Sequence, residues 1–374
     1  MAAVPKVLLA PITVTPSKPL TPSHLKGLFW ADVLHRATGH LAEVTYRYSH
    51  TTYHRTEQVL GFWEFLDRTE GDTDYRGATE TEIGELYVRY RAQEDRPGAA
   101  ALRPYAEAVE ESGWVHPASE RVLRLWSGHY ERLGLHDPGL REHQPPGLGL
   151  EEMIDRLVAA GCGLDQRRWG GSVHLDLTRW GLPLRQIVTP DGRPNYLACA
   201  LRELLVLAPR YDEVVFLYDR ELAPDYRLLE RLLGSADTVV RCVPIGRVPI
   251  DGRIVSARHG GWQDHTVDRL LAAVDDEHDV PAIRLGLRLY FIAMLGPGDQ
   301  QSFRHDLLAK SCARAERLLD RAARDPKADS AELRADLSRY QHSHRYVDPY
   351  RLTSSLLARS RRTIDAGLLS EVFL

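Results

Sequence analysis

Lysine, hydroxyl and histidine side chains gather in the segment Lys18-Pro-Leu-Thr-Pro-Ser-His24, which follows a short apolar run, Val7 to Ala10. The apolar run predicts a buried strand, and the pattern after the segment predicts a helix with Ser23 as its N-cap. Such a strand, loop and helix N-terminus make an anion site, because unpaired backbone N–H groups and the positive end of the helix dipole converge there. His24 could add a hydrogen bond to a phosphate. The alternative is an ordinary strand-to-helix turn with a structural histidine.

Alternating strands and helices would hold this segment in place. The predicted strands are 7–10, 42–48, 214–218 and 239–244, and the predicted helices include 197–207 and 226–233. This alternation is typical of a doubly wound parallel sheet, in which ligands bind beyond the C-terminal ends of the strands. Because His24, Thr51 and Asp219 all fall at such ends, we expect them to face one ligand site.

The rest of the chain divides into two blocks. Residues 61–185 are interpreted as an insertion between the two halves of a nucleotide-binding fold, with a linker-like break at 144–149. The helices predicted within it are 80–91, 106–112, 119–133 and 151–160. Residues 283–374 predict helices throughout, and an apolar stripe of helical spacing runs from Leu307 to Ala322. The basic cluster of Arg359, Arg361 and Arg362 is either a solvated helix face or a contact to an RNA backbone.

The composition narrows the classes of protein to which this chain could belong. The 374 residues carry a formal charge of −4 at pH 7, so no strong field draws the chain to DNA or to a membrane surface. The absence of a secretory segment and of a membrane-length apolar run indicates a cytoplasmic protein. Cys162, Cys199, Cys242 and Cys312 are scattered, which predicts buried thiols and no zinc site. The excess of arginine over lysine is typical of a GC-rich bacterial gene.

The segment around His24 resembles the first signature of class I aminoacyl-tRNA synthetases. That family has Gly-Pro-Leu-His-x-Gly-His, followed by a helix containing Ala-Asp-Val-Leu. Here Thr21 falls at the first histidine of this "HIGH" motif, Ser23 at its glycine and His24 at its last histidine, with Asp32-Val-Leu34 in the helix that follows. The resemblance implies that Thr21, His24 and Lys18 contact ATP phosphates and that Ser23 lies against the nucleotide. Ser23 departs from the family, whose glycine lets the base approach the backbone closely.

A second segment resembles arginyl-tRNA synthetases, which have Ser-Asp-Gly-Thr-x-x-Tyr, a helix, and a strand that ends in Trp-Gly-x-Asp. Thr189-Pro-Asp-Gly-Arg-Pro-Asn-Tyr196 matches the first part. Asp219 and Glu221 fall near the last part, where the family meets the ATP ribose. The acidic residue that holds arginine's guanidinium in the family is Ala200 here, which argues against arginine as the substrate.

The resemblance also implies an amino-acid pocket. In the family, a Gly-Thr-Asp-x-His-Gly segment after the second strand lines this pocket, and Ser49-His-Thr-Thr-Tyr-His54 occupies that place here. His50, His54 and Tyr196 are therefore the candidate amino-acid-binding residues. The alternative for the two histidines is a polar loop at the end of a strand.

The segment Asp251-Gly-Arg-Ile-Val-Ser-Ala-Arg-His-Gly-Gly261 resembles the family's Asp-Gly-x-Lys-Met-Ser-Lys-Ser-x-Gly-Asn signature. Ile254 and Ala257 replace its two lysines. Arginine binds phosphate well, so Arg258 could take over the role of the missing lysine. The resemblance implies nucleotide contacts from Ser256, Arg258 and His259.

Together these observations predict an α/β fold, a Rossmann-like doubly wound parallel sheet of the class I synthetase type. We expect the first half of the catalytic core at 1–60, an insertion at 61–185, the second half of the core at 186–275 and a helical domain at 276–374. No full anticodon-binding domain is expected.

The leading hypothesis is a synthetase paralogue in specialised metabolism, which resembles the trimmed cysteine ligases of the mycothiol pathway. It would use ATP and Mg²⁺ to form an aminoacyl-adenylate and pass the acyl group to a small amine or a carrier. The missing lysines keep a second hypothesis open, a transferase that takes its acyl group from charged tRNA without ATP. The third is a non-catalytic binding or regulatory protein. No metal site built from protein ligands alone is predicted.

Overall fold

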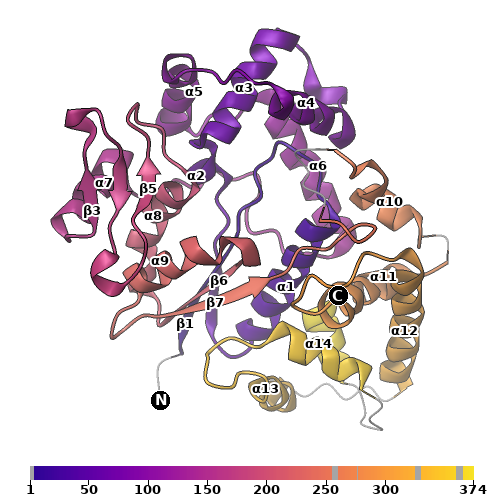
Figure 1. Cartoon of the computed structure of the whole chain (residues 1–374). Helices are drawn as coiled ribbons and strands as arrows, with labels where there is room; N and C mark the ends of the chain where they lie inside the picture. The colour runs from indigo at the N-terminus through magenta and orange to yellow at the C-terminus, as the bar shows by residue number, and fades with distance from the viewer. Residues whose placement is uncertain (1–3, 255–259, 276, 325–329, 359–364) are drawn as a thin grey trace.

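A four-stranded parallel sheet lies at the centre of the molecule (Figure 1). The structure is a computed structural model that describes residues 4–254, 260–275, 277–324, 330–358 and 365–374. The strands, in their order across the sheet, are β2 (Glu43–Tyr46), β1 (Lys6–Pro11), β6 (Glu213–Asp219) and β7 (Val239–Ile245). All neighbouring strands are parallel, so their C-terminal ends meet at one edge. The predicted parallel sheet is confirmed.

Side chains of β1 and β6 alternate between two hydrophobic cores. One core joins Val7, Leu9, Val215 and Leu217 to α1 (Pro22–Gly39), and the other joins Leu8, Val214 and Phe216 to α8 (Tyr196–Leu207) and α9 (Ala223–Leu233). Helix α1 therefore covers one face of the sheet, while α8 and α9 cover the other. The chain leaves β1 toward β2 and leaves β6 toward β7, so a topological switch point lies between β1 and β6.

Helix α1 begins earlier than the sequence predicts. Its N-cap is Thr21, with Pro22 as the first helical residue, so the prediction of Ser23 as N-cap is wrong. Proline suits the first turn because its missing N–H would have no partner inside the helix. The side chain of Ser23 is thereby released for another contact: its Oγ accepts a hydrogen bond of 3.0 Å from the backbone N–H of Val248. This contact joins α1 to the segment that follows β7.

Between β2 and β6 the chain forms a group of helices and a small second sheet. The helices from the end of β2 onward are α2 (His50–His54), α3 (Glu57–Glu70), α4 (Glu80–Ala92), α5 (Ala99–Ser112), α6 (Pro117–Leu133) and α7 (Leu150–Ala159). The second sheet is antiparallel and contains β3 (Gly163–Asp165), β4 (Val173–Leu175) and β5 (Arg185–Val188). The segment after β2, whose alternative prediction was a loop, forms the short helix α2. Strand β5, at the start of the segment expected to form the second half of the core, pairs with β4 and not with the parallel sheet.

From Val267 onward, the described residues form helices joined by loops and turns. The α-helices are α10 (Val267–Ala272), α11 (Val280–Arg288), α12 (His305–Arg324), α13 (Ser330–Ser338), α14 (Pro349–Leu357) and α15 (Ala366–Leu368). The predicted apolar stripe of α12 is confirmed as a core face, since Leu308, Cys312, Ala315, Leu318 and Ala322 are buried. The cluster of Arg359, Arg361 and Arg362 lies outside the described residues.

The structure also bears on the predictions made from the cysteines and from the absence of a long apolar run. The four cysteines are free thiols, and Cys162, Cys199 and Cys312 are buried while Cys242 is partly buried. Among the described helices, none combines the length and the apolar character needed to cross a bilayer.

Candidate nucleotide and substrate site

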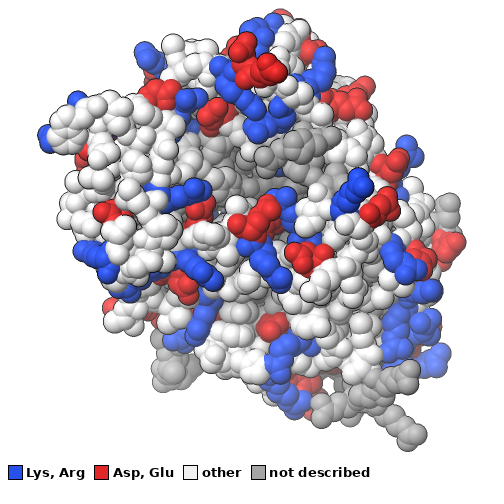
Figure 2. All heavy atoms as spheres, in the orientation of Figure 1, with Lys and Arg blue, Asp and Glu red and all other residues white. Residues whose placement is uncertain are grey.

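A cavity of about 470 Å³ opens beyond the C-terminal ends of β1, β6 and β7. Its walls come from the loop after β1, the first turns of α1, the start of α3, residues 189–200, the end of β6 and helix α9. Figure 2 shows this face of the molecule, hollowed in front of the sheet, with basic and acidic side chains mixed around the hollow. The cavity lies at the switch point between β1 and β6, where doubly wound sheets bind their ligands.

His24 reaches the cavity from the first turn of α1. The backbone N–H of Thr21 donates to His24 Nδ1 over 3.1 Å, so in the neutral ring the proton is carried by Nε2. Burial lowers the pKa of His24 to about 3, and the nearby positive charges of Lys18 and Arg247 contribute to this shift. The imidazole is therefore neutral at physiological pH, although a hydrogen bond with the backbone of Pro19 acts against the lowering of its pKa.

Arg247 is the second basic group that acts on His24, and it is not among the site residues predicted from the sequence. It follows β7 and lines the cavity. Its Nε donates to Asp219 Oδ2 over 3.0 Å, and Nη2 pairs with Glu221. Asp219 lines the cavity with Arg247, whereas Glu221 is more than half exposed and lies outside the described lining. The rule that ligands bind at strand ends could have found Arg247, because it comes two residues after β7.

Lys18 and Lys26 have different surroundings. Lys18 lines the cavity, and its Nζ lies 5.9 Å from the centre of the Tyr87 ring. Lys26 is buried instead, and its Nζ donates to the carbonyl of Gly298 over 2.5 Å. Burial lowers the pKa of Lys26 to about 8, although the charge of Asp299 opposes this shift. Lys18 is thus the lysine of this helix region that lines the cavity.

Three solved structures share this architecture, although no protein-family model and no curated protein matches the chain. Arginyl-tRNA synthetase from Thermus thermophilus has a TM-score of 0.63 at 15% identity, over 99% of this chain and 79% of its own. A Campylobacter jejuni protein described as an arginyl-tRNA synthetase has a TM-score of 0.53 at 14% identity, over 98% of this chain and 90% of its own. The Plasmodium falciparum arginyl-tRNA synthetase has a TM-score of 0.52 at 11% identity, over 90% of this chain and 62% of its own.

The chain has the fold of a class I aminoacyl-tRNA synthetase. Thr21, Ser23 and His24, from the segment that resembles the first signature, all line the cavity together with Lys18 and Asp219. The structure thus brings together the predicted phosphate candidates of the first segment and the ribose candidate Asp219, while the other ribose candidate, Glu221, lies outside the lining.

Tyr196 forms a fixed wall of the cavity. Its hydroxyl donates to the carbonyl of Thr13 over 2.7 Å, and its ring stacks on Tyr53 at 4.2 Å between ring centres. Because the Tyr196 hydroxyl is already bound to the backbone, this residue offers the ligand mainly its ring. A second aromatic wall is formed by Tyr226, which stacks on Tyr218 at 4.0 Å.

His50 and His54 are buried in α2 and do not line this cavity. Their ring centres lie 4.7 Å apart, and His54 also packs its ring against Trp63. Burial lowers the pKa of His50 to about 4, with a contribution from the charge of His143, and lowers the pKa of His54 well below its ordinary value. In this structure the two histidines form part of the packing behind the cavity wall.

The third signature is only partly described. Ser256, Arg258 and His259 lie outside the described residues. Gly260, which follows them, has φ of +77°, a conformation that favours glycine. Within the described part of the chain, no group of three or more His, Cys, Asp or Glu side chains is arranged to hold a metal ion.

Proposed function

We propose that this protein binds ATP in the cavity and activates the carboxylate of an amino acid as an aminoacyl-adenylate. The observation that carries this proposal is the gathering of Lys18, His24 and Arg247 at the N-terminus of α1. Two basic side chains beside a neutral imidazole donor and a helix N-terminus form a site suited to a polyphosphate. ATP also brings Mg²⁺, which would be held chiefly by the phosphate oxygens.

The proposed reaction is a displacement at the α-phosphorus. A carboxylate oxygen of the amino acid forms a new bond to this phosphorus while the bond to the bridging oxygen of the β-phosphate breaks, and pyrophosphate leaves with the negative charge. His24 Nε2–H, Lys18 and the first backbone N–H groups of α1 would stabilise that charge. Groups of this kind contribute about 2–4 kcal/mol each to the transition state.

Asp219 and Arg247 have separate roles in this proposal. The carboxylate of Asp219, at the end of β6, would accept hydrogen bonds from the ribose hydroxyls, with Glu221 beside it at the rim. Arg247, which pairs with both carboxylates, would hold them in place and turn a guanidinium edge toward the phosphates. Ser256, Arg258 and His259 are proposed to approach the phosphates from the third signature.

We further propose that the acyl group passes to a small amine or a carrier. The substitution of both signature lysines by Ile254 and Ala257 favours one second candidate, a transferase that receives its acyl group from charged tRNA and does not use ATP. A protein of that kind would form a salt-dependent complex with tRNA and show no ATP chemistry.

Amino-acid-dependent exchange of pyrophosphate into ATP tests the proposal. We expect exchange with at least one amino acid in a panel, and a loss of about 100-fold in His24→Ala and in Lys18→Ala, because each variant removes a donor to the phosphates. Lys310→Ala is the matched control, since this lysine is exposed on α12 and should leave exchange unchanged. The absence of exchange in folded protein, or equal losses in all three variants, would contradict adenylate formation.

A further inference from the structure

The acidic side chains of the cavity are already neutralised by arginines of the same chain. Among the described residues that line the cavity, the carboxylates are Glu57, Asp219 and Asp225. Arg193 Nη1 lies 3.2 Å from Glu57 Oε2, and Arg247 Nε lies 3.0 Å from Asp219 Oδ2. Asp225 is held by two contacts from the same arginine, Arg185, at 2.8 and 2.9 Å.

These pairs determine what charge a substrate side chain can carry. A cationic side chain needs a carboxylate whose oxygens can accept its hydrogen bonds. Each cavity carboxylate already accepts from a guanidinium of this chain, and that positive charge offsets its own. A substrate guanidinium would therefore gain less attraction from these carboxylates than from an unpaired one, and it would also lie beside an arginine of the same charge.

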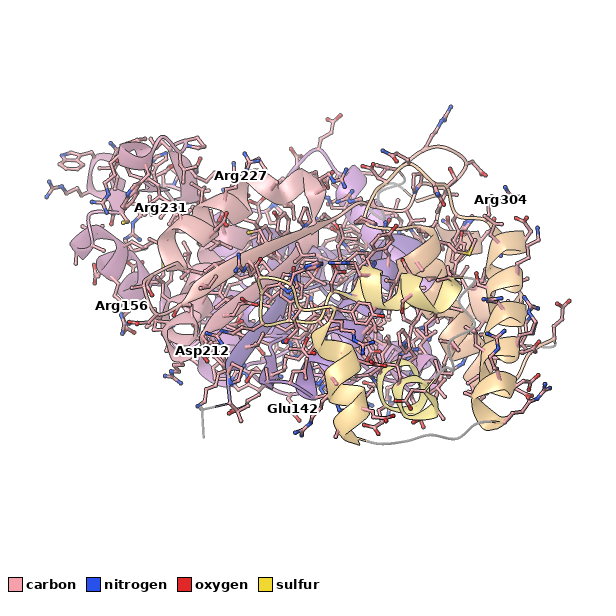
Figure 3. All side chains as sticks on the ribbon, turned by 90° about the horizontal axis from the view of Figure 1, so that it is seen from below. Glu142, Arg156, Asp212, Arg227, Arg231 and Arg304 are labelled. Atoms are coloured by element: carbon pink, nitrogen blue, oxygen red, sulfur yellow. The ribbon has the colours of Figure 1, made fainter. Side chains whose placement is uncertain are left out.

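The wall formed by α8 and α9 offers apolar and aromatic surface instead. It consists of Tyr196, Leu197, Ala200, Tyr226 and Leu229. The basic side chains of α9 do not contribute, because Arg227 and Arg231 are exposed on the outer face of the helix, as Figure 3 shows. Ala200 belongs to this wall, lies on the second turn of α8 and is almost fully buried.

The cavity thus has two chemically different ends. The end at the N-terminus of α1 carries Lys18, His24 and Arg247 and suits an anion. The end against α8 and α9 lies on the opposite face of the sheet and suits an uncharged side chain. We propose that the acid activated here has an apolar or aromatic side chain, and that Ala200 and the three carboxylate–arginine pairs exclude cationic amino acids. This inference rests on the proposed function for the identity of the site, but it concerns which amino acid binds.

Equilibrium binding tests the inference without requiring any chemistry. Calorimetric titrations would compare L-phenylalanine and L-leucine with L-arginine and L-lysine, each with the wild type and two variants, in the presence of Mg²⁺-ATP and in its absence. We expect the wild type to bind the two neutral amino acids about 10- to 100-fold more tightly than the two cationic ones. A factor of this size is expected when one charged group is buried without a hydrogen-bond partner.

Ala200→Asp adds an unpaired carboxylate to the apolar wall, and we expect it to shift the preference toward arginine and lysine by a similar factor. Ala200→Asn is the matched control, because it adds nearly the same volume without charge and should weaken all four amino acids without reversing their order. Reversal by Ala200→Asp alone supports the inference. The inference would be overturned if the wild type preferred arginine or lysine, or if it bound all four amino acids with equal affinity. Failure to bind any of the four would also overturn it.

The two proposals can fail separately. Selective binding of neutral amino acids without pyrophosphate exchange would contradict adenylate formation and leave the substrate class standing. Exchange driven by arginine would support adenylate formation and contradict the substrate class. A loss of ATP affinity in Ala200→Asp with unchanged amino-acid preference would show that this wall holds the nucleotide, which also overturns the inference.

Discussion

At the scale of single residues, the aspartate of the signature helix is a structural group. Asp32 is buried and accepts hydrogen bonds from Arg288 Nη2 at 2.6 Å, Arg36 Nε at 3.0 Å and the backbone N–H of His136 at 2.8 Å. Burial alone would raise the pKa of Asp32, but the charges of Arg288 and Arg36 hold it below its ordinary value. This carboxylate therefore ties α1 to α11, and it does not line the cavity.

Removing Arg288 should therefore destabilise the whole protein. In Arg288→Met the carboxylate of Asp32 stays buried with one basic partner fewer, and we expect a loss of about 3–5 kcal/mol in the free energy of unfolding. Arg36→Met removes the partially exposed partner and should cost less. Urea unfolding followed by circular dichroism measures both, and equal losses would show that burial does not set the strength of these contacts.

At the scale of elements, helices α11 and α12 pack closely against each other at Gly286. A Cβ atom added at Gly286 would lie 2.7 Å from the Cα and Sγ atoms of Cys312. Glycine at this position is required by helix packing and not by an unusual backbone angle, since Gly286 lies inside α11. The two helices can therefore lie this close together because residue 286 has no Cβ atom.

Gly286→Ala should force the two helices apart, and we expect a loss of about 1–3 kcal/mol in stability, the usual cost of overpacking a core. Gly128→Ala on the exposed side of α6 is the matched control, because its Cβ would meet nothing within 4 Å. That control should gain about 0.5–1 kcal/mol from helix propensity. Thermal unfolding of both variants measures the difference, and a Gly286→Ala protein as stable as the wild type would contradict the packing argument.

At the scale of the whole molecule, many histidines are held neutral by the protein interior. Burial lowers the pKa of His24, His35, His50, His54, His116 and His136. In the unfolded chain each of these rings would bind a proton near pH 6.5. The unfolded state therefore takes up more protons than the folded state as the pH falls from about 6.5 to about 4, so stability must fall with pH over this interval.

The dependence of the free energy of unfolding on pH tests whether these histidines stay neutral in the folded protein. Each buried histidine contributes up to about 1.4 kcal/mol per pH unit within the interval. Urea unfolding at half-unit steps from pH 4.5 to 7.5 should give a steep decline below pH 6.5, and the double variant His50→Gln, His54→Gln should give a shallower one. A flat profile, or an unchanged slope in the double variant, would mean that these rings do not stay neutral in the folded protein.

Much of the fold could be predicted because its signals are local. The strand before the signature turn, the β-branched run of β6 and the stop of α7 near Gly161 depend on residues adjacent in the chain. The start of a helix is harder to predict where two residues can serve as its N-cap. Thr21 and Ser23 are both good N-cap residues, and the proline between them favours Thr21 because proline suits the first helical position.

The parallel sheet could be predicted from the alternation of strands and helices along the chain, and the strand-to-helix turn at His24 and the apolar face of α12 from the spacing of neighbouring residues. The charge of the cavity, in contrast, depends on contacts between distant parts of the chain. Asp219 and Arg247 are 28 residues apart and Glu57 and Arg193 lie in different elements, so their pairing depends on how β6, β7, α3 and the turn before α8 meet in space. The tertiary structure also decided that His50 and His54 pack behind the wall, because the side of a short helix that faces the core is set by its neighbours.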